Sequence, residues 1–132
     1  VKAETADRGY TTTLFGRRRY FEGFKSPLPF IRASAERMAI NAPIQGTQAD
    51  VIKIAMARID EFLVKNGLEE KARLILQIHD ELIYEVDKSA IDDLPEKIKK
   101  IMADVLTPEQ TKGVPILTEC AMGDSWGDLK KV

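Results

Sequence analysis

The chain has 132 residues, of which 44% are hydrophobic and 31% charged, and its formal net charge is −1. This composition is typical of a globular domain and excludes an intrinsically disordered chain. No apolar run approaches membrane-spanning length and no secretory signal opens the chain, so we expect no membrane partner and a cytoplasmic location.

Charge is distributed unevenly along the chain. Residues 1–58 hold ten Lys and Arg against five Asp and Glu, a balance of +5, whereas residues 59–132 hold ten against sixteen, a balance of −6. A basic half suits contact with the phosphates of a nucleic acid. A solvated charged face is the alternative that composition leaves open.

The first predicted elements are a short helix and a hairpin. Residues 1–8 are polar and helix-prone, and Gly9 ends them as if a longer helix had been cut, which suggests a fragment or a subunit. Residues 10–21 are β-prone and turn at Gly16, so we expect a hairpin. Its exit carries three consecutive basic residues that either grip phosphates or keep an edge strand soluble: Arg17, Arg18 and Arg19.

After a loop over residues 22–30, helical character begins near residues 31–34. Three polar residues of this helix are spaced i, i+4, i+8 and therefore share one face, even with a break or kink at Pro43: Arg37, Asn41 and Gln45. One guanidinium and two amides suit the minor groove of a duplex, whose acceptors occur at every base pair. An ordinary exposed polar face is the alternative.

A second helix is predicted from Thr47 or Gln48 to about Lys65, where Asn66-Gly67 stops it. Its apolar residues repeat with helical period and predict a packing face behind the strands that follow: Val51, Ile52, Ala55, Ile59, Phe62 and Leu63.

The central stretch joins two apolar, β-prone runs, residues 74–78 and 82–86, through His79, Asp80 and Glu81. Only a tight turn fits between the runs, which predicts a hairpin. Two-residue turns ordinarily carry Asn-Gly or Asp-Gly, so His79-Asp80 serves something other than easy turn geometry. Carboxylates held between stiff strands suit Mg²⁺, which takes oxygen ligands in a fixed geometry. A solvated acidic turn is the alternative.

The C-terminal third is predicted to hold a helix and a strand. Ser89 and Asp92 are expected to cap the helix. Residues 107–115 are predicted as a loop and residues 116–122 as a last strand, which could pair with the central hairpin in a three-stranded antiparallel sheet. The single cysteine, Cys120, lies in that apolar run, which favours a buried structural thiol over a nucleophile.

Three ordered blocks resemble the family A DNA polymerases of the bacterial DNA polymerase I type. They are residues 9–20, which include Leu-Phe-Gly-Arg-Arg-Arg-Tyr, residues 35–47, and the His-Asp-Glu turn at 79–81, which resembles motif C. Gly123-Asp-Ser-Trp126 resembles the Gly-x-x-Trp ending of the family. The resemblance covers about residues 9–126.

This resemblance implies an α+β fold, a palm-subdomain fragment whose antiparallel sheet centres on a hairpin at about 74–86 and is backed by helices. We expect a single domain. Within it, residues 1–30 would be the end of the fingers with the arginine-rich hairpin, and residues 31–132 would be the palm portion.

The resemblance also implies part of a DNA-directed DNA polymerase that transfers nucleotides with two Mg²⁺ ions. Asp80 would be one of two metal-bridging aspartates, Glu81 a supporting carboxylate, and His79 would lie near the primer terminus. The polar helix residues Arg37, Asn41 and Gln45 would contact the primer–template duplex. The resemblance also favours contact with DNA over a merely solubilising role for Arg17, Arg18 and Arg19.

Several parts of such an enzyme would lie upstream of Val1, including the first aspartate motif and the helix that holds the nucleotide. The expected partners are therefore primer–template DNA, dNTPs and the missing upstream segment. We expect the chain alone to be inactive, and we expect Arg37 to face the same side as Asp80. A non-catalytic nucleic-acid-binding module needs the helix row but not Asp80, and a structural module derived from a polymerase needs neither.

Overall fold

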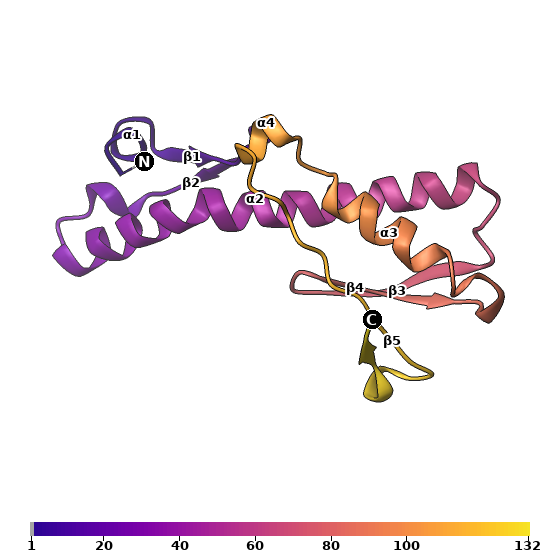
Figure 1. Cartoon of the computed structure of the whole chain (residues 1–132). Helices are drawn as coiled ribbons and strands as arrows, with labels where there is room; N and C mark the ends of the chain where they lie inside the picture. The colour runs from indigo at the N-terminus through magenta and orange to yellow at the C-terminus, as the bar shows by residue number, and fades with distance from the viewer. Residues whose placement is uncertain (1) are drawn as a thin grey trace. The chain divides into compact units, whose positions relative to one another are not determined.

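The computed structural model describes residues 2–132 (Figure 1). They form two compact units, one that ends at Asp50 and one that runs Val51–Val132. The boundary falls inside the long helix α2, Pro29–Lys65. Within residues 2–132 the strands form three two-stranded antiparallel sheets. The predicted mixture of helices and small antiparallel sheets is confirmed, whereas the predicted division at residues 30 and 31 lies inside α2 and stays a prediction.

The first unit combines a hairpin with the first part of α2. It holds α1 (Lys2–Arg8), β1 (Tyr10–Thr12), β2 (Arg18–Tyr20) and the 3₁₀ helix η1 (Gly23–Lys25). Gly9 ends α1 as expected, with φ +78° and its N–H donating to the Thr5 carbonyl at 2.7 Å. The hairpin pairs Tyr10 with Tyr20 and Thr12 with Arg18. On α2 small residues make the buried face of this unit: Ala35, Ala39 and Ala42.

Helix α2 is continuous over 37 residues, where the sequence predicted a start near residue 31 and two helices joined near Thr47. Pro29 lies in the first turn, where its missing N–H costs no hydrogen bond. Pro43 lies inside the helix and removes one i→i−4 bond. Packing of the apolar face on both sides outweighs that local cost. Despite its length, α2 is not apolar enough to cross a bilayer, and nor is any other helix of residues 2–132.

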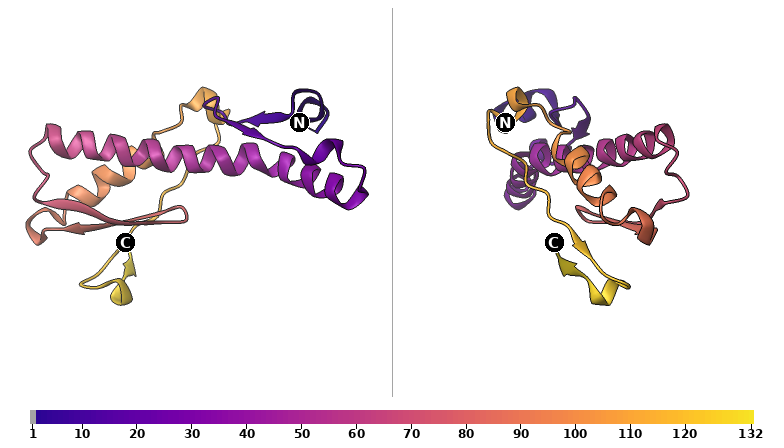
Figure 2. Two further views of the ribbon diagram at one scale, coloured as in Figure 1. Left: turned by 180° about the vertical axis from the view of Figure 1, so that it is seen from behind. Right: turned by 45° about the vertical axis from the view of Figure 1, so that its right-hand side comes forward.

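The second unit packs a hairpin and a helix on the remaining part of α2. Its elements are β3 (Ala72–Ile78), β4 (Glu81–Val86), the 3₁₀ helix η2 (Lys88–Ala90), α3 (Leu94–Ala103), α4 (Pro108–Thr111), β5 (Ala121–Met122), η3 (Trp126–Asp128) and β6 (Lys130–Lys131). Both views in Figure 2 show α3 beside the end of α2, next to the β3–β4 hairpin. Five residues form the core: Ile59, Leu63, Ala72, Leu94 and Ile98.

The predicted third strand of the hairpin sheet was wrong. Residues 114–120 have no regular structure, and β5 pairs with β6 in a separate sheet, Ala121 with Lys131 and Met122 with Lys130. A partner close in the sequence costs less loop-closure entropy than the distant hairpin. The Lys130-Lys131 pair gave no strand signal, and Lys131 is held by an ion pair to Glu119 at 2.6 Å.

The predicted cap of α3 was also wrong. The Asp87 carboxylate accepts from the N–H and the hydroxyl of Ser89, at 2.9 and 2.6 Å, and so caps η2. Helix α3 instead begins behind Asp93, whose side chain makes no capping hydrogen bond, and Asp92 plays no capping part. The Ser89 bonds, with a smaller effect of Lys71, hold the pKa of Asp87 below its ordinary value.

The predicted loop over residues 107–115 contains the one-turn helix α4. Thr107 and Gln110 open it with a reciprocal capping box, because each side chain accepts the backbone N–H of the other. The Thr-x-x-Gln signal was visible in the sequence.

Tyr84 makes the second unit sensitive to alkali. Burial raises the pKa of Tyr84 to about 12 from an ordinary value of 10.0, and the charge of Asp60 adds to the rise. Between these values the unfolded chain loses the phenol proton first, so the free energy of unfolding falls as pH rises. We expect urea unfolding from about pH 9 to about pH 12 to show this loss, and Tyr84→Phe to remove part of it.

Tyr20→Phe is the matched control for this experiment, because the Tyr20 side chain is exposed. It should keep the pH dependence of the unmodified chain. If Tyr84→Phe leaves the alkaline loss as steep as before, burial of this phenol is not its cause.

Candidate functional site

The His79-Asp80-Glu81 tip lies where β3 turns into β4. Ile78 pairs with Glu81, so His79 and Asp80 are the two residues of the turn. His79 has φ +52°, in the left-handed region that glycine adopts at lower cost. Gln77 supports the turn by donating from Nε2 to the His79 carbonyl oxygen at 2.7 Å. The turn thus keeps a histidine against a local conformational cost.

All three tip residues are exposed and can therefore be reached by a metal ion or a nucleic acid. Within the described residues 2–132, no three His, Cys, Asp or Glu side chains gather as a metal site. The carboxylates of Asp80 and Glu81 suit Mg²⁺ in kind, since this ion prefers oxygen donors. They supply only part of the octahedral shell that Mg²⁺ demands. The tip carboxylates therefore suit a Mg²⁺ site to which other residues also contribute ligands.

A bulge in β3 separates the tip of the hairpin from its base. Leu74 pairs with Tyr84 and Leu76 with Ile83, so Ile75 is an extra residue on β3. Because strand side chains alternate between two faces, this extra residue sets the face on which the tip side chains emerge. The run is also exposed, and 61% of Ile75 is accessible to solvent.

The three residues of the predicted polar row are all exposed on α2: Arg37, Asn41 and Gln45. Gln45 also lines a hollow of about 210 Å³ together with Arg19, Thr11 and Thr13. The structure thus brings one residue of the row, Gln45, and two hairpin arginines, Arg17 and Arg19, to a common site. Arg37 belongs to the first unit and Asp80 to the second. That the two side chains face the same side of the protein stays a prediction.

The three consecutive arginines have different surroundings, which their sequence did not reveal. Arg17 makes an ion pair with Asp50, whereas Arg18 lies over the Tyr10 ring at 4.6 Å and Arg19 over the Phe21 ring at 5.2 Å. A side-chain hydrogen bond with Tyr20 raises the pKa of Arg18 further above its ordinary value. Arg18 and Arg19 therefore present permanent positive charge on an exposed strand.

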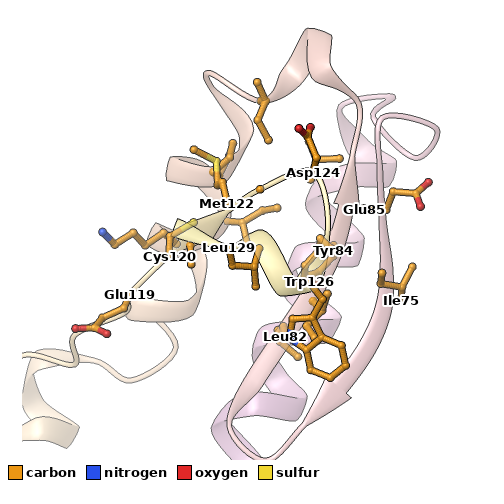
Figure 3. Close-up of a pocket in the computed structure, with 18 of the residues that line it drawn as sticks. Ile75, Leu82, Tyr84, Glu85, Glu119, Cys120, Met122, Asp124, Trp126 and Leu129 are labelled. Atoms are coloured by element: carbon orange, nitrogen blue, oxygen red, sulfur yellow. The ribbon is translucent and has the colours of Figure 1, made fainter. Parts of the chain in front are cut away.

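Sequence reasoning missed a larger hollow inside the second unit. About 740 Å³ lies between β4, α3 and the C-terminal segment 118–129 (Figure 3). Tyr84, Met122 and Trp126 give it apolar walls, and the tip residues do not line it. Cys120 lines it and is half-buried, more accessible than the buried thiol that was predicted.

Residues 1–128 match the model of DNA polymerase family A. The chain is 41% identical over 128 residues to DNA polymerase I of Pseudomonas aeruginosa, covering 97% of the chain and 13% of that protein. It is 43% identical over 127 residues to DNA polymerase I of Bacillus subtilis, covering 96% of the chain and 14% of that protein.

A solved structure is similar in fold as well. The POL domain of Pol1 from M. smegmatis, in complex with DNA primer-template and dNTP, matches with a TM-score of 0.75 and 39% identity over 81% of the chain and 18% of that structure's chain. The present chain thus spans 13–14% of the length of these curated relatives.

Proposed function

Because this chain belongs to DNA polymerase family A, we propose that it acts as the motif C part of the palm in a longer DNA-directed DNA polymerase. The observation that carries the proposal is the His79-Asp80-Glu81 turn, which keeps a histidine at positive φ and exposes two adjacent carboxylates. A turn with only a structural role would be cheaper with glycine at position 79.

The reaction is attack of a primer 3′-hydroxyl on the α-phosphate of a dNTP, with pyrophosphate as the leaving group. Two Mg²⁺ ions, when bound, would supply activation of the attacking oxygen and stabilisation of the leaving group. Asp80 would hold metal through its carboxylate, and Glu81 would support it from the next position. His79 would orient the primer terminus. The two-residue turn limits the freedom of the backbone that carries these side chains, which would help to preorganise them.

The proposed DNA contacts come from the first unit. The exposed row on α2 would donate to minor-groove acceptors, and the exposed strand arginines would pair with phosphates: Arg37, Asn41 and Gln45, with Arg18 and Arg19. Such contacts bind without reading sequence, which a template-directed enzyme requires. The hollow shared by Gln45 and Arg19 supports this set. Arg17 belongs to the same basic loop, but Asp50 and the Gly46 carbonyl engage its guanidinium.

The chain alone should be inactive, and a primer-extension assay tests this. With Mg²⁺ and dNTPs, we expect no product from the purified 132-residue chain and full extension by the intact protein that carries it. One catalytic aspartate cannot replace the positioning groups that the reaction needs. Adding the upstream part of the polymerase domain in trans should restore some product. Extension by the chain alone would show that the required residues have been misjudged.

A non-catalytic nucleic-acid-binding module is the second candidate. It is favoured by one observation, namely that the proposed DNA contacts on α2 and the hairpin lie in the first unit whereas Asp80 lies in the second. A structural module would need neither the DNA contacts nor Asp80. An intact protein that binds duplex DNA but extends no primer would establish the binding module.

A further inference from the structure

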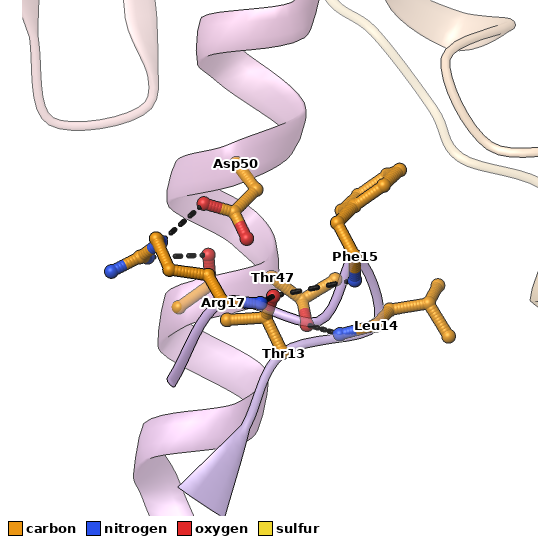
Figure 4. Close-up of polar contacts among 7 residues, drawn as sticks. Thr13, Leu14, Phe15, Arg17, Thr47 and Asp50 are labelled. Atoms are coloured by element: carbon orange, nitrogen blue, oxygen red, sulfur yellow. Dashed lines mark hydrogen bonds and ion pairs between the residues drawn. The ribbon is translucent and has the colours of Figure 1, made fainter. Parts of the chain in front are cut away.

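The loop between β1 and β2 is fastened to α2 by three hydrogen bonds (Figure 4). The Leu14 N–H donates to Thr47 Oγ1 at 3.0 Å. Arg17 donates from Nε to Asp50 Oδ1 at 2.7 Å and from Nη2 to the Gly46 carbonyl at 3.2 Å. Together these three bonds form the loop clasp. They join residues about thirty positions apart and so fix the hairpin on the helix.

The loop and α2 are closely packed where Thr13 faces Gly46. A Cβ at Gly46 would lie 2.7 Å from Thr13 Cγ2, so the helix approaches the loop at a position where only glycine fits without rearrangement. Thr13 also shapes the loop itself, because its Oγ1 accepts from the N–H groups of Phe15 and Arg17 at 3.3 and 3.2 Å. Loop and helix are thus shaped for each other at this point.

Arg17 differs from Arg18 and Arg19 because its guanidinium pairs with a carboxylate of the protein. The Asp50 side chain is only 10% exposed, and its partner Arg17 is 50% exposed. A charge-assisted bond to a buried carboxylate is stronger than a solvated ion pair. The planar guanidinium serves Asp50 and the Gly46 carbonyl at once, which a lysine ammonium cannot do in the same geometry. The positive charge of Arg17 is therefore paired with Asp50 inside the protein.

The clasp also sets the shape of the hollow of about 210 Å³. Arg17 lines it together with Gln45 from α2 and Arg19 from β2. The spacing between these two proposed DNA contacts depends on how the hairpin sits on the helix. Loss of the clasp would leave both side chains present but free to move apart.

We propose that Arg17 is a positioning residue, which holds the β1–β2 hairpin on α2 so that Arg19 and Gln45 engage one DNA duplex together, and which does not contact DNA itself. This inference rests on the proposed DNA-binding function. The competing assignment is a direct phosphate contact by Arg17. The two assignments predict opposite results for Asp50→Ala, since loss of an acidic group strengthens binding by a phosphate-contacting Arg17 and weakens binding that depends on the clasp.

The experiment measures the affinity of the intact protein for primer–template DNA over a series of salt concentrations. We expect Arg17→Ala and Asp50→Ala each to weaken binding about tenfold, the order that misplaced contacts cost, and to show the same salt slope as each other because both release the same hairpin. Arg19→Ala should reduce the slope by about 0.9, because one phosphate contact is lost. Arg17→Lys should bind as poorly as Arg17→Ala, although it keeps the charge.

Hydrogen exchange of the Leu14 amide gives a readout that does not involve DNA. Exchange should be faster in Arg17→Ala and Asp50→Ala than in the unmodified protein, and unchanged in Arg19→Ala. A lower salt slope for Arg17→Ala than for Asp50→Ala, restored binding in Arg17→Lys, or tighter binding by Asp50→Ala would overturn the positioning role. If the unmodified protein binds no DNA, the proposed function fails instead, and the exchange rates still decide whether Arg17 fastens the loop.

Discussion

Asp80→Ala in the intact protein that carries this chain should lower the rate of primer extension by about a thousandfold or more, with little change in affinity for DNA. In the proposed mechanism the carboxylate would act where charge develops during phosphoryl transfer, and removing such a group costs at least the order measured for single transition-state contacts. DNA affinity should persist, because the proposed duplex contacts lie on other elements, α2 and the first hairpin. Single-turnover extension and equilibrium DNA binding measure the two effects separately.

Glu85→Ala is the matched control for Asp80→Ala. Glu85 is an exposed carboxylate on the same hairpin, but it pairs with Arg73 near the base of the hairpin, away from the turn. The substitution removes the same charge and should leave extension close to that of the unmodified enzyme. Equal losses in the two variants would mean that general charge matters and that Asp80 has no special part.

Ile59→Ala should destabilise the second unit by about 4 kcal/mol, the upper range for deletion of a large buried aliphatic side chain. The Ile59 side chain is 0% exposed and lies in the cluster that joins α2 to the hairpin and α3. Urea unfolding of the 132-residue chain measures the change, with the fluorescence of Trp126 as a probe in the same unit.

Val64→Ala on the same helix controls for helix propensity and handling. Val64 is 52% exposed, so its truncation should cost less than about 0.5 kcal/mol. Similar costs for Ile59→Ala and Val64→Ala would contradict the assignment of Ile59 to the core.

Local signals in the sequence were sufficient for much of the fold. The two hairpins follow from short β-prone runs around tight turns, and the end of α2 follows from Asn66-Gly67, where Gly67 has φ +64°. Local signals failed where contacts between residues distant in the sequence determine the secondary structure. Pro43 does not divide α2, because the buried faces on both sides of it hold one helix together. The β5–β6 pair escaped detection because two lysines give no strand pattern.

The candidate site shows the same division. The exposed tip and the exposed row on α2 follow from turn length and helical spacing, which are local properties. The different surroundings of Arg17 and its neighbours do not, since Asp50 lies 33 positions away along the chain. The identity of a side chain gives its charge, but only the folded structure shows whether that charge is turned towards another part of the protein.

The bulge at Ile75 has an evolutionary consequence for the hairpin. Strand β3 uses seven residues where β4 uses six, so the number of residues between base and tip determines on which side Asp80 emerges. Exchange of one aliphatic residue for another leaves that number unchanged, whereas deletion of a single residue would turn the tip carboxylate to the opposite side. Descendants of this gene should therefore vary the composition of the hairpin far more freely than its length.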